Sequence, residues 1–128
     1  MEMIAHDADS VPVAVGGYTN GLEVIGARRL LFVSGQIPEG RDGEVPDDAA
    51  GQCRLIWRNI VETLAHAGLT VANIVKVTTY LSDRSLAAIN TAVRTEVLDG
   101  HQPALTVVLA GIFNPRWLLE IEVIAAEG

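Results

Sequence analysis

Two glutamates with one residue between them, Glu120 and Glu122, are the side chains that most directly suggest chemistry in this sequence. They alternate with Leu119, Ile121 and Val123, which is typical of a β-strand whose side chains point in turn to opposite faces. Both carboxylates would then share one face. A carboxylate in a cleft can place or activate water, and a pair can divide acid and base roles. Any strand with one solvated face has the same spacing, so a structural role for the pair stays open.

Metal and cofactor chemistry has little support. His6, His66 and His101 are scattered without the spacing of metal ligands. Cys53 is the only cysteine, and it falls on the apolar stripe of a predicted helix, which favours a buried structural thiol. Neither the glycine-rich dinucleotide motif nor a P-loop occurs. We therefore expect no metal and no cofactor.

The strands that must position the glutamates follow from short apolar or alternating runs. These runs cover residues 21–25, 29–34, 74–81, 104–110 and 118–125. The first two are separated by Gly26 and Ala27, which predicts a hairpin. The run 104–110 is nearly all apolar, so we expect both of its faces to be buried. Residues 1–16 are expected to form only a lead-in segment.

Two stretches have apolar residues at helical spacing. The first covers residues 47–67, between an aspartate cap after Pro46 and Gly68; the second begins near residues 82–85 and runs to about Leu98. The order strand, strand, helix, strand, helix, strand, strand predicts a single α/β domain over residues 1–128. Both helices would cover one face of a mixed sheet and leave the other face for a partner subunit.

Composition narrows the possible partners. The net charge is −7 and no basic cluster is larger than Arg28–Arg29, so nucleic acid is not an expected partner. No apolar stretch approaches the length of a membrane span, so no membrane partner is expected. A lone cysteine suits a reducing compartment, so we expect a cytoplasmic protein. The apolar share of 49% is high for a small domain and favours burial of surface in an oligomer.

Several segments resemble the reactive-intermediate deaminase family (RidA or YjgF-type proteins, also described as endoribonuclease L-PSP-like). They are Gly17–Tyr18, the run Phe32–Pro38 that contains Ser-Gly-Gln-Ile-Pro, Ile74–Thr78, Asn90 and the ending Leu119–Ala125. The similarity extends in order from about residue 12 to 125. It implies a chorismate-mutase-like fold and a homotrimer with three sheets around a central barrel. Small-molecule clefts would lie between the subunits.

The resemblance also implies an activity. Archetypal members hydrolyse reactive enamines and imines, such as 2-aminoacrylate, to a 2-keto acid and ammonia. Carried over by position, Glu120 would orient water, while Tyr18, Ser34 and Gly35 would line the cleft. The arginine with which the family grips a carboxylate is replaced here by Leu105, which cannot bind an anion by charge. We expect a deaminase framework with an altered substrate, less anionic or more apolar than a short 2-imino acid.

Several alternatives stay open at this stage. Arg116, in the loop before the Glu120 strand, either replaces the missing guanidinium or is a solvated loop residue, and Trp117 beside it could cover an apolar cleft. Asn90 could brace the site or serve only the helix. The whole protein could instead be a trimer that binds a metabolite or a partner protein without turnover, or a structural remnant. Leu105 favours these roles, whereas Glu120 favours the enzyme.

Overall fold

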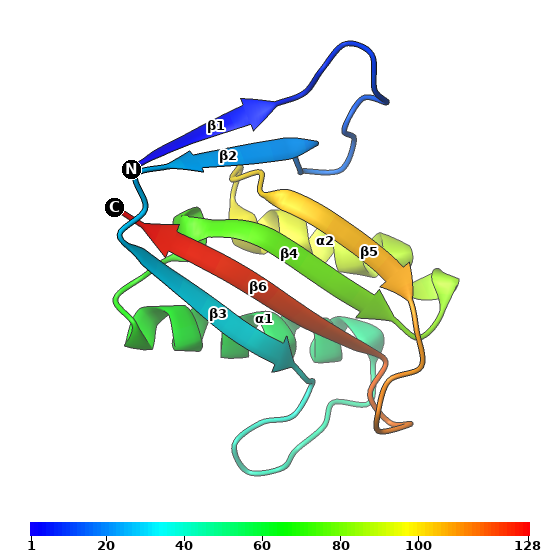
Figure 1. Ribbon diagram of the computed structural model, residues 1–128. Coiled ribbons are helices and arrows are strands. Elements are labelled where there is room, and N and C mark those ends of the chain that lie inside the picture. The colour runs from blue at the N-terminus through cyan, green and yellow to red at the C-terminus, as the bar shows by residue number, and fades with distance from the viewer.

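The computed structural model describes residues 1–128 as an α+β fold in which two helices cover one face of a four-stranded mixed sheet (Figure 1). A separate two-stranded sheet lies beside this layer. The strands are β1 (Glu2–His6), β2 (Gly21–Ile25), β3 (Arg29–Gln36), β4 (Ile74–Leu81), β5 (Ala104–Leu109) and β6 (Leu119–Glu127). The helices are α1 (Ala49–His66) and α2 (Ala87–Leu98), with short 3-10 turns at Val71–Asn73 and Arg84–Leu86. Neither α1 nor α2 combines the length and apolarity that a membrane crossing requires.

The larger sheet has the strand order β3-β6-β4-β5. β6 runs antiparallel to both of its neighbours, whereas β4 and β5 are parallel and are joined through α2. The prediction of a mixed sheet with both helices on one face is thereby confirmed. The glutamate-bearing strand β6 lies in the interior of the sheet, where neighbours on both sides fix its position.

The first helix begins and ends close to where the sequence indicates. The side chain of Asp48 caps α1 by accepting a hydrogen bond from the Gly51 N–H at 3.1 Å. Gly68 follows the last turn with a φ of +76°, in the left-handed region that favours glycine. The observed helix is two residues shorter at its start and one residue shorter at its end than the predicted one, within the usual variation of helix boundaries.

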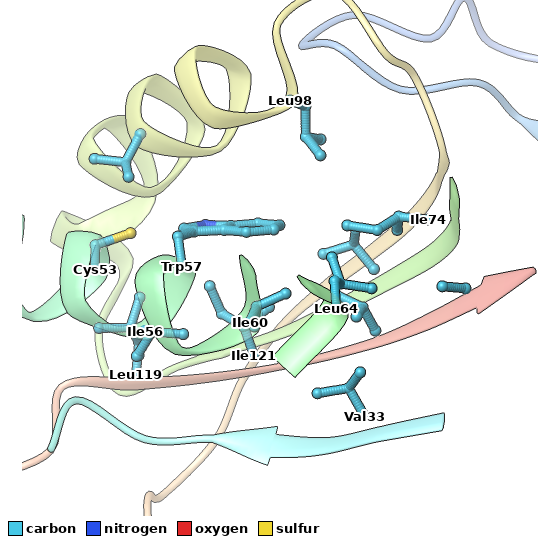
Figure 2. Packing of buried hydrophobic residues seen from close by; sticks show 14 of the residues in the cluster. Val33, Cys53, Ile56, Trp57, Ile60, Leu64, Ile74, Leu98, Leu119 and Ile121 are labelled. Carbon is cyan, nitrogen blue, oxygen red and sulfur yellow. The ribbon is translucent and has the colours of Figure 1, made fainter. Parts of the chain in front are cut away.

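The hydrophobic core fills the space between the helices and the sheet. Figure 2 shows Ile56 and Ile60 of α1 above Leu119 and Ile121 of β6, with Trp57 beside them. All five of these side chains are buried. Burial of this apolar surface is the main stabilising term for the layer that carries the candidate site.

The predicted hairpin between residues 21–25 and 29–34 is wrong. β2 pairs instead with β1, in a register that places Gly21 opposite His6, and β3 pairs with β6 in the other sheet. Gly26, with a φ of +75°, turns the chain from one sheet to the other. The lead-in prediction for residues 1–16 is accordingly wrong over Glu2–His6. β1 buries no side chain, so its sequence has no apolar periodicity by which to recognise it.

The prediction that the strand at 104–110 is buried on both faces is also wrong for the single chain. β5 is an edge strand, hydrogen-bonded to β4 on one side only. Its last four residues, Thr106–Leu109, are exposed. Apolar composition alone cannot distinguish a strand buried within its own subunit from an edge strand available to another one.

Candidate functional site

Glu120 projects from β6 onto the face of the sheet that carries no helix. Its register partner on β4 is Tyr80, and the neighbouring residues Leu119 and Ile121 point into the core on the opposite face. The predicted alternation along this strand is therefore confirmed. Glu120 is half-buried and makes no hydrogen bond with its side chain, so the carboxylate is available to a ligand or to water.

Gly35 lies next to Glu120, where the register of β3 against β6 shifts between Val33 and Gln36, and Ser34 precedes it beside Glu122. A β-carbon added to Gly35 would come within 2.8 Å of Glu120 Cδ and 3.0 Å of its Oε1. The glycine thus allows the backbone of β3 to lie directly against the carboxylate. The structure thus brings the predicted site residues Gly35 and Glu120 together, with Ser34 adjacent on the same strand.

Glu122 shares the helix-free face, but its carboxylate already has a partner. The hydroxyl of Tyr80 donates a hydrogen bond to Glu122 Oε1 at 2.9 Å. This hydrogen bond to an anion raises the pKa of Tyr80. Glu122 also borders a hollow of about 230 Å³ with Ser34 and Lys76. The two glutamates therefore have different surroundings, and Glu120 is the one without a partner.

Tyr18 and Leu105 meet in a second pocket, of about 360 Å³. It lies between the segment before β2, α2 and the edge strand β5. The Thr19 N–H donates to the Pro103 carbonyl oxygen at 3.2 Å, which holds Tyr18 beside the start of β5. Leu105 pairs in register with Val77 and packs against the core, so it faces the helix side of the sheet.

Asn90 and Arg94 of α2 line this same pocket and are both buried. Arg94 Nη2 donates to the Gly16 carbonyl oxygen at 2.5 Å, while its Nε and Nη1 have no hydrogen-bond partner. Asn90 Oδ1 has none either. Burial lowers the pKa of the Arg94 guanidinium because it disfavours the charged form. The buried polar groups of this pocket are thus left with unused hydrogen-bonding capacity.

Arg94 is the residue that the sequence pattern did not reveal. Its signal is a polar pair four residues apart, Asn90 and Arg94, on either side of the buried Val93. Two polar side chains within the inward-facing stripe of a helix are uncommon unless each has a partner. The apolar spacing that predicts this helix relies partly on Ile89 and Val97, which are only half-buried.

Arg116 occupies the exposed loop between β5 and β6 and does not line the Tyr18–Leu105 pocket. Only its backbone is anchored. Its carbonyl oxygen accepts a hydrogen bond from Gln52 Nε2 at 3.0 Å, and the same nitrogen donates to the Pro46 carbonyl at 2.9 Å. The oxygen of Gln52 accepts from the Leu118 N–H at 2.8 Å. The buried Gln52 therefore fixes the loop that precedes β6.

A larger hollow, of about 540 Å³, lies between α1 and the loop after β3. It is lined mainly by exposed charged residues, including Arg41, Arg54 and Arg58, and by none of the predicted site residues. Arg54 is already paired with Glu96 at 3.0 Å. Size alone does not make this hollow the better candidate, because it has neither buried polar groups nor a free carboxylate beside a glycine.

The predicted site residues thus form two groups. Ser34, Gly35 and Glu120 lie together at the helix-free face, whereas Tyr18 and Leu105 lie on the helix side at the β5 edge. The hollow beside Ser34 and the pocket beside Tyr18 have no lining residue in common. One group offers a free carboxylate that can hold a water or accept a proton, and the other offers a half-apolar cavity with buried donors.

Known proteins similar to this chain match it over most of its length. A family model described as "Endoribonuclease L-PSP" matches residues 9–127. The 2-iminobutanoate/2-iminopropanoate deaminase of Escherichia coli is 32% identical over 121 residues, which cover 91% of this chain and 92% of that protein. The RutC family protein PH0854 of Pyrococcus horikoshii is 34% identical over 119 residues, covering 91% and 92%.

Solved structures share the fold. YyfB of Yersinia pestis, described as a member of the conserved Rid protein family, superposes with a TM-score of 0.89 at 25% identity, covering 99% of this chain and 100% of that one. E. coli TdcF with bound serine gives 0.73 at 31% identity, covering 98% and 99%. The chain therefore belongs to the RidA/YjgF family of endoribonuclease L-PSP-like proteins, which includes enzymes named as imine deaminases.

Proposed function

We propose that this protein is a deaminase that hydrolyses a small imine or enamine, with Glu120 holding the attacking water. The observation that carries the proposal is the free Glu120 carboxylate beside the bare backbone of Gly35. A relative that is 32% identical is named as a deaminase of 2-imino acids, which supports the same reaction class.

The chemistry requires one carboxylate and one water. Glu120 accepts a proton from the water as the water oxygen bonds to the imine carbon, and the electron pair of the C=N bond moves to nitrogen, which takes that proton back from Glu120. The resulting carbinolamine then breaks its C–N bond, releases ammonia and leaves the ketone. In this second step Glu120 accepts the hydroxyl proton of the carbinolamine and donates it to the departing nitrogen, so the carboxylate is regenerated. No oxidant and no cofactor enters this sequence.

A homotrimer would complete the site. Leu30 and Phe32 of β3 and Val108 of β5 are exposed apolar residues on the helix-free side of the sheet. Large apolar side chains in such numbers on one face favour contact with another subunit. In the proposed assembly, the Glu120 group of one subunit meets the Tyr18–Leu105 group of its neighbour, and each meeting forms one cleft.

Leu105 sets the expected substrate apart from the short 2-imino acids. Its side chain adds apolar surface to the Tyr18 pocket, at the position where the family has an arginine. A leucine there gains nothing from a carboxylate and favours an apolar group on the substrate. We therefore propose a more apolar substrate than 2-iminopropanoate.

The second candidate is a trimer that binds a metabolite without turnover. Leu105 favours this role, because without an arginine there the substrate would have to be oriented by other groups. Glu120 would then be only a polar group that contacts the ligand. Turnover by the purified protein distinguishes this role from the enzyme.

The test compares wild type with Glu120→Gln and with Glu122→Gln as the matched control from the same strand face. Imines are generated in the cuvette by an amino-acid oxidase acting on 2-aminobutyrate or leucine, and ammonia release is followed above the uncatalysed rate. We expect Glu120→Gln to lower kcat by about 10² to 10⁴-fold, the usual contribution of a positioned acid-base group. Glu122→Gln should stay near wild type.

Two outcomes contradict the enzyme. One is wild-type protein that does not accelerate either hydrolysis, which would make binding the leading role. The other is Glu120→Gln with full activity and unchanged oligomeric state. The leucine-derived imine should be the better substrate of the two if Leu105 selects an apolar group.

A further inference from the structure

We propose that Arg94 of α2 is the anion-binding residue of this site, replacing the guanidinium that Leu105 lacks, and that the ligand is a carboxylate with an apolar side chain. This inference rests on the proposed function for its location, since the Tyr18–Leu105 pocket belongs to that cleft. It assigns the anion to Arg94 rather than to Arg116.

The charge of Arg94 has no counter-ion within the chain. Arg94 is only 3% exposed, and the three ion pairs of the structure all lie elsewhere. A guanidinium remains protonated in proteins, so burial without a carboxylate leaves an uncompensated cation. The Gly16 carbonyl satisfies one of its nitrogens, while Nε and Nη1 stay unpaired. An anion is the partner that would remove this penalty.

The unpaired atoms indicate what the anion carries. Nε and Nη2 form one edge of the planar guanidinium, and such an edge binds the two oxygens of a carboxylate by parallel hydrogen bonds. Nε has no partner, and Nη2 is held only by the Gly16 carbonyl oxygen. Asn90, which is 1% exposed and one helical turn before Arg94, has an unpaired Oδ1 in the same pocket. That oxygen can accept from an N–H or O–H next to the carboxylate. A 2-imino or 2-amino acid carries a carboxylate and, on the neighbouring carbon, a nitrogen with an N–H.

The charge of Arg94 accounts for an apolar residue at position 105. Both line the same pocket, so an arginine at position 105 would place a second guanidinium near the first one. Two buried like charges disfavour each other strongly. With the cation supplied by α2, position 105 becomes free to contact the ligand's side chain, together with Ala87 and Val107. The pocket thus combines one cationic end with an apolar wall.

The ligand has to displace part of the chain, because neither Nε nor Nη1 touches solvent. The segment beside them includes Gly16 and Gly17, with φ values of +115° and +79°. Gly17 is packed so closely on α2 that a β-carbon would come within 2.7 Å of Thr95 Cγ2. The carboxylate takes the place of the Gly16 carbonyl on Arg94, and the backbone freedom of two successive glycines permits the shift.

The experiment measures binding of 4-methyl-2-oxopentanoate and its methyl ester by titration calorimetry at fixed ionic strength. The acid and ester differ in charge, and neither contains a C=N bond to hydrolyse. Wild type is compared with Arg94→Gln, with Arg94→Gln combined with Leu105→Arg, and with Arg116→Ala as the exposed control. We expect wild type to bind the acid at least about tenfold more tightly than the ester, as paired charge-assisted hydrogen bonds require.

Arg94→Gln should abolish the preference for the acid, and adding Leu105→Arg should restore it by returning a guanidinium to the pocket. A purely structural Arg94 would not be rescued in this way. The proposal is overturned by wild type that binds neither probe or shows no preference, by Arg94→Gln that keeps it, or by Arg116→Ala that loses it.

If Arg94→Gln does not fold, Arg94→Lys is measured instead. Lysine keeps the charge but lacks the planar pair of donors, so acid affinity should fall by about fivefold or more. Unchanged affinity overturns the proposal. Because these probes report binding alone, wild type that turns over imines but shows no preference for the acid contradicts only the assignment of Arg94. Wild type that prefers the acid but turns over no imine contradicts only the proposed hydrolysis.

Discussion

Gly35 lies so close to Glu120 that the site has no room for a side chain at position 35: a β-carbon there would come within 2.8 Å of the carboxyl carbon. The contact joins the irregular part of β3 to the strand β6. It makes the orientation of the carboxylate depend on a residue that has no functional group of its own.

Gly35→Ala should therefore impair turnover more than stability. The new methyl group meets only the flexible end of Glu120, which can rotate away at small energetic cost. Turnover should fall by about 10-fold to 100-fold, because a misplacement of about 1 Å has that effect on a positioned group. Steady-state kinetics and thermal unfolding measure the two effects. Gly111→Ala is the control, since a β-carbon there meets nothing within 4 Å; equal turnover in both variants would contradict the prediction.

Phe32→Asp should prevent the proposed trimer. Phe32 is 69% exposed in the single chain and lies on the helix-free side of β3. A carboxylate placed in an apolar interface loses its hydration, so association becomes unfavourable. Light scattering should give the mass of one chain, and imine turnover should disappear with the shared cleft. Phe113→Asp serves as the control, because Phe113 is 96% exposed in a loop; a wild-type protein of monomeric mass would refute the assembly.

Ile60→Ala should destabilise the layer that supports β6. Ile60 is fully buried in α1 above the sheet, and such truncations cost about 2–5 kcal/mol of unfolding free energy. Val61→Ala, at the next position of the same helix, should change it by no more than about 0.5 kcal/mol because Val61 is partly exposed. Denaturant unfolding measures both, and similar losses at the two positions would be inconsistent with this packing.

Cys53 should be unreactive in the folded protein. Burial raises the pKa of its thiol from 9.0 to about 11, so the nucleophilic thiolate is scarce at pH 8. A thiol-specific disulfide reagent should label the native protein slowly and the unfolded protein at once. Because the folded pKa is the higher one, the thiol contributes a stability that is complete below pH 9 and lost as the pH rises to about 11. Cys53→Ala should lack that component, and rapid native labelling at pH 8 would contradict the assignment.

Regular packing made most of the main layer predictable. The strand over residues 74–81 and the two helices follow from apolar periodicity, since each element buries one face in the same core. β6 could be predicted for the same reason, and with it the common face of the two glutamates. The pairing of β2 could not be predicted. It depends on β1, whose exposed side chains leave no pattern in the sequence.

The site was predictable only in part. The residues that resemble the family led to Glu120 and Gly35, which the structure places in contact. Arg94 was missed because a charged residue on a helix is expected to be solvated, and only the tertiary structure shows that it is buried beside Leu105. Spacing along the chain cannot indicate which polar atoms stay without partners.

The hydrogen bonds of the Gln52 side chain determine which loop residues can vary in sequence. Gln52 holds the loop before β6 through the carbonyl oxygens of Pro46 and Arg116 and the N–H of Leu118. These are backbone groups: every residue has the carbonyl oxygen, and every residue except proline has the N–H. The path of the loop thus does not depend on the Arg116 side chain. Asn114 is the position to keep, because its Oδ1 accepts a hydrogen bond from the Arg116 N–H at 2.9 Å. Residues 111–113 and 116 can be randomised in a combinatorial library while β6 keeps its place, so the loop beside the sheet can bind new ligands without disturbing Glu120.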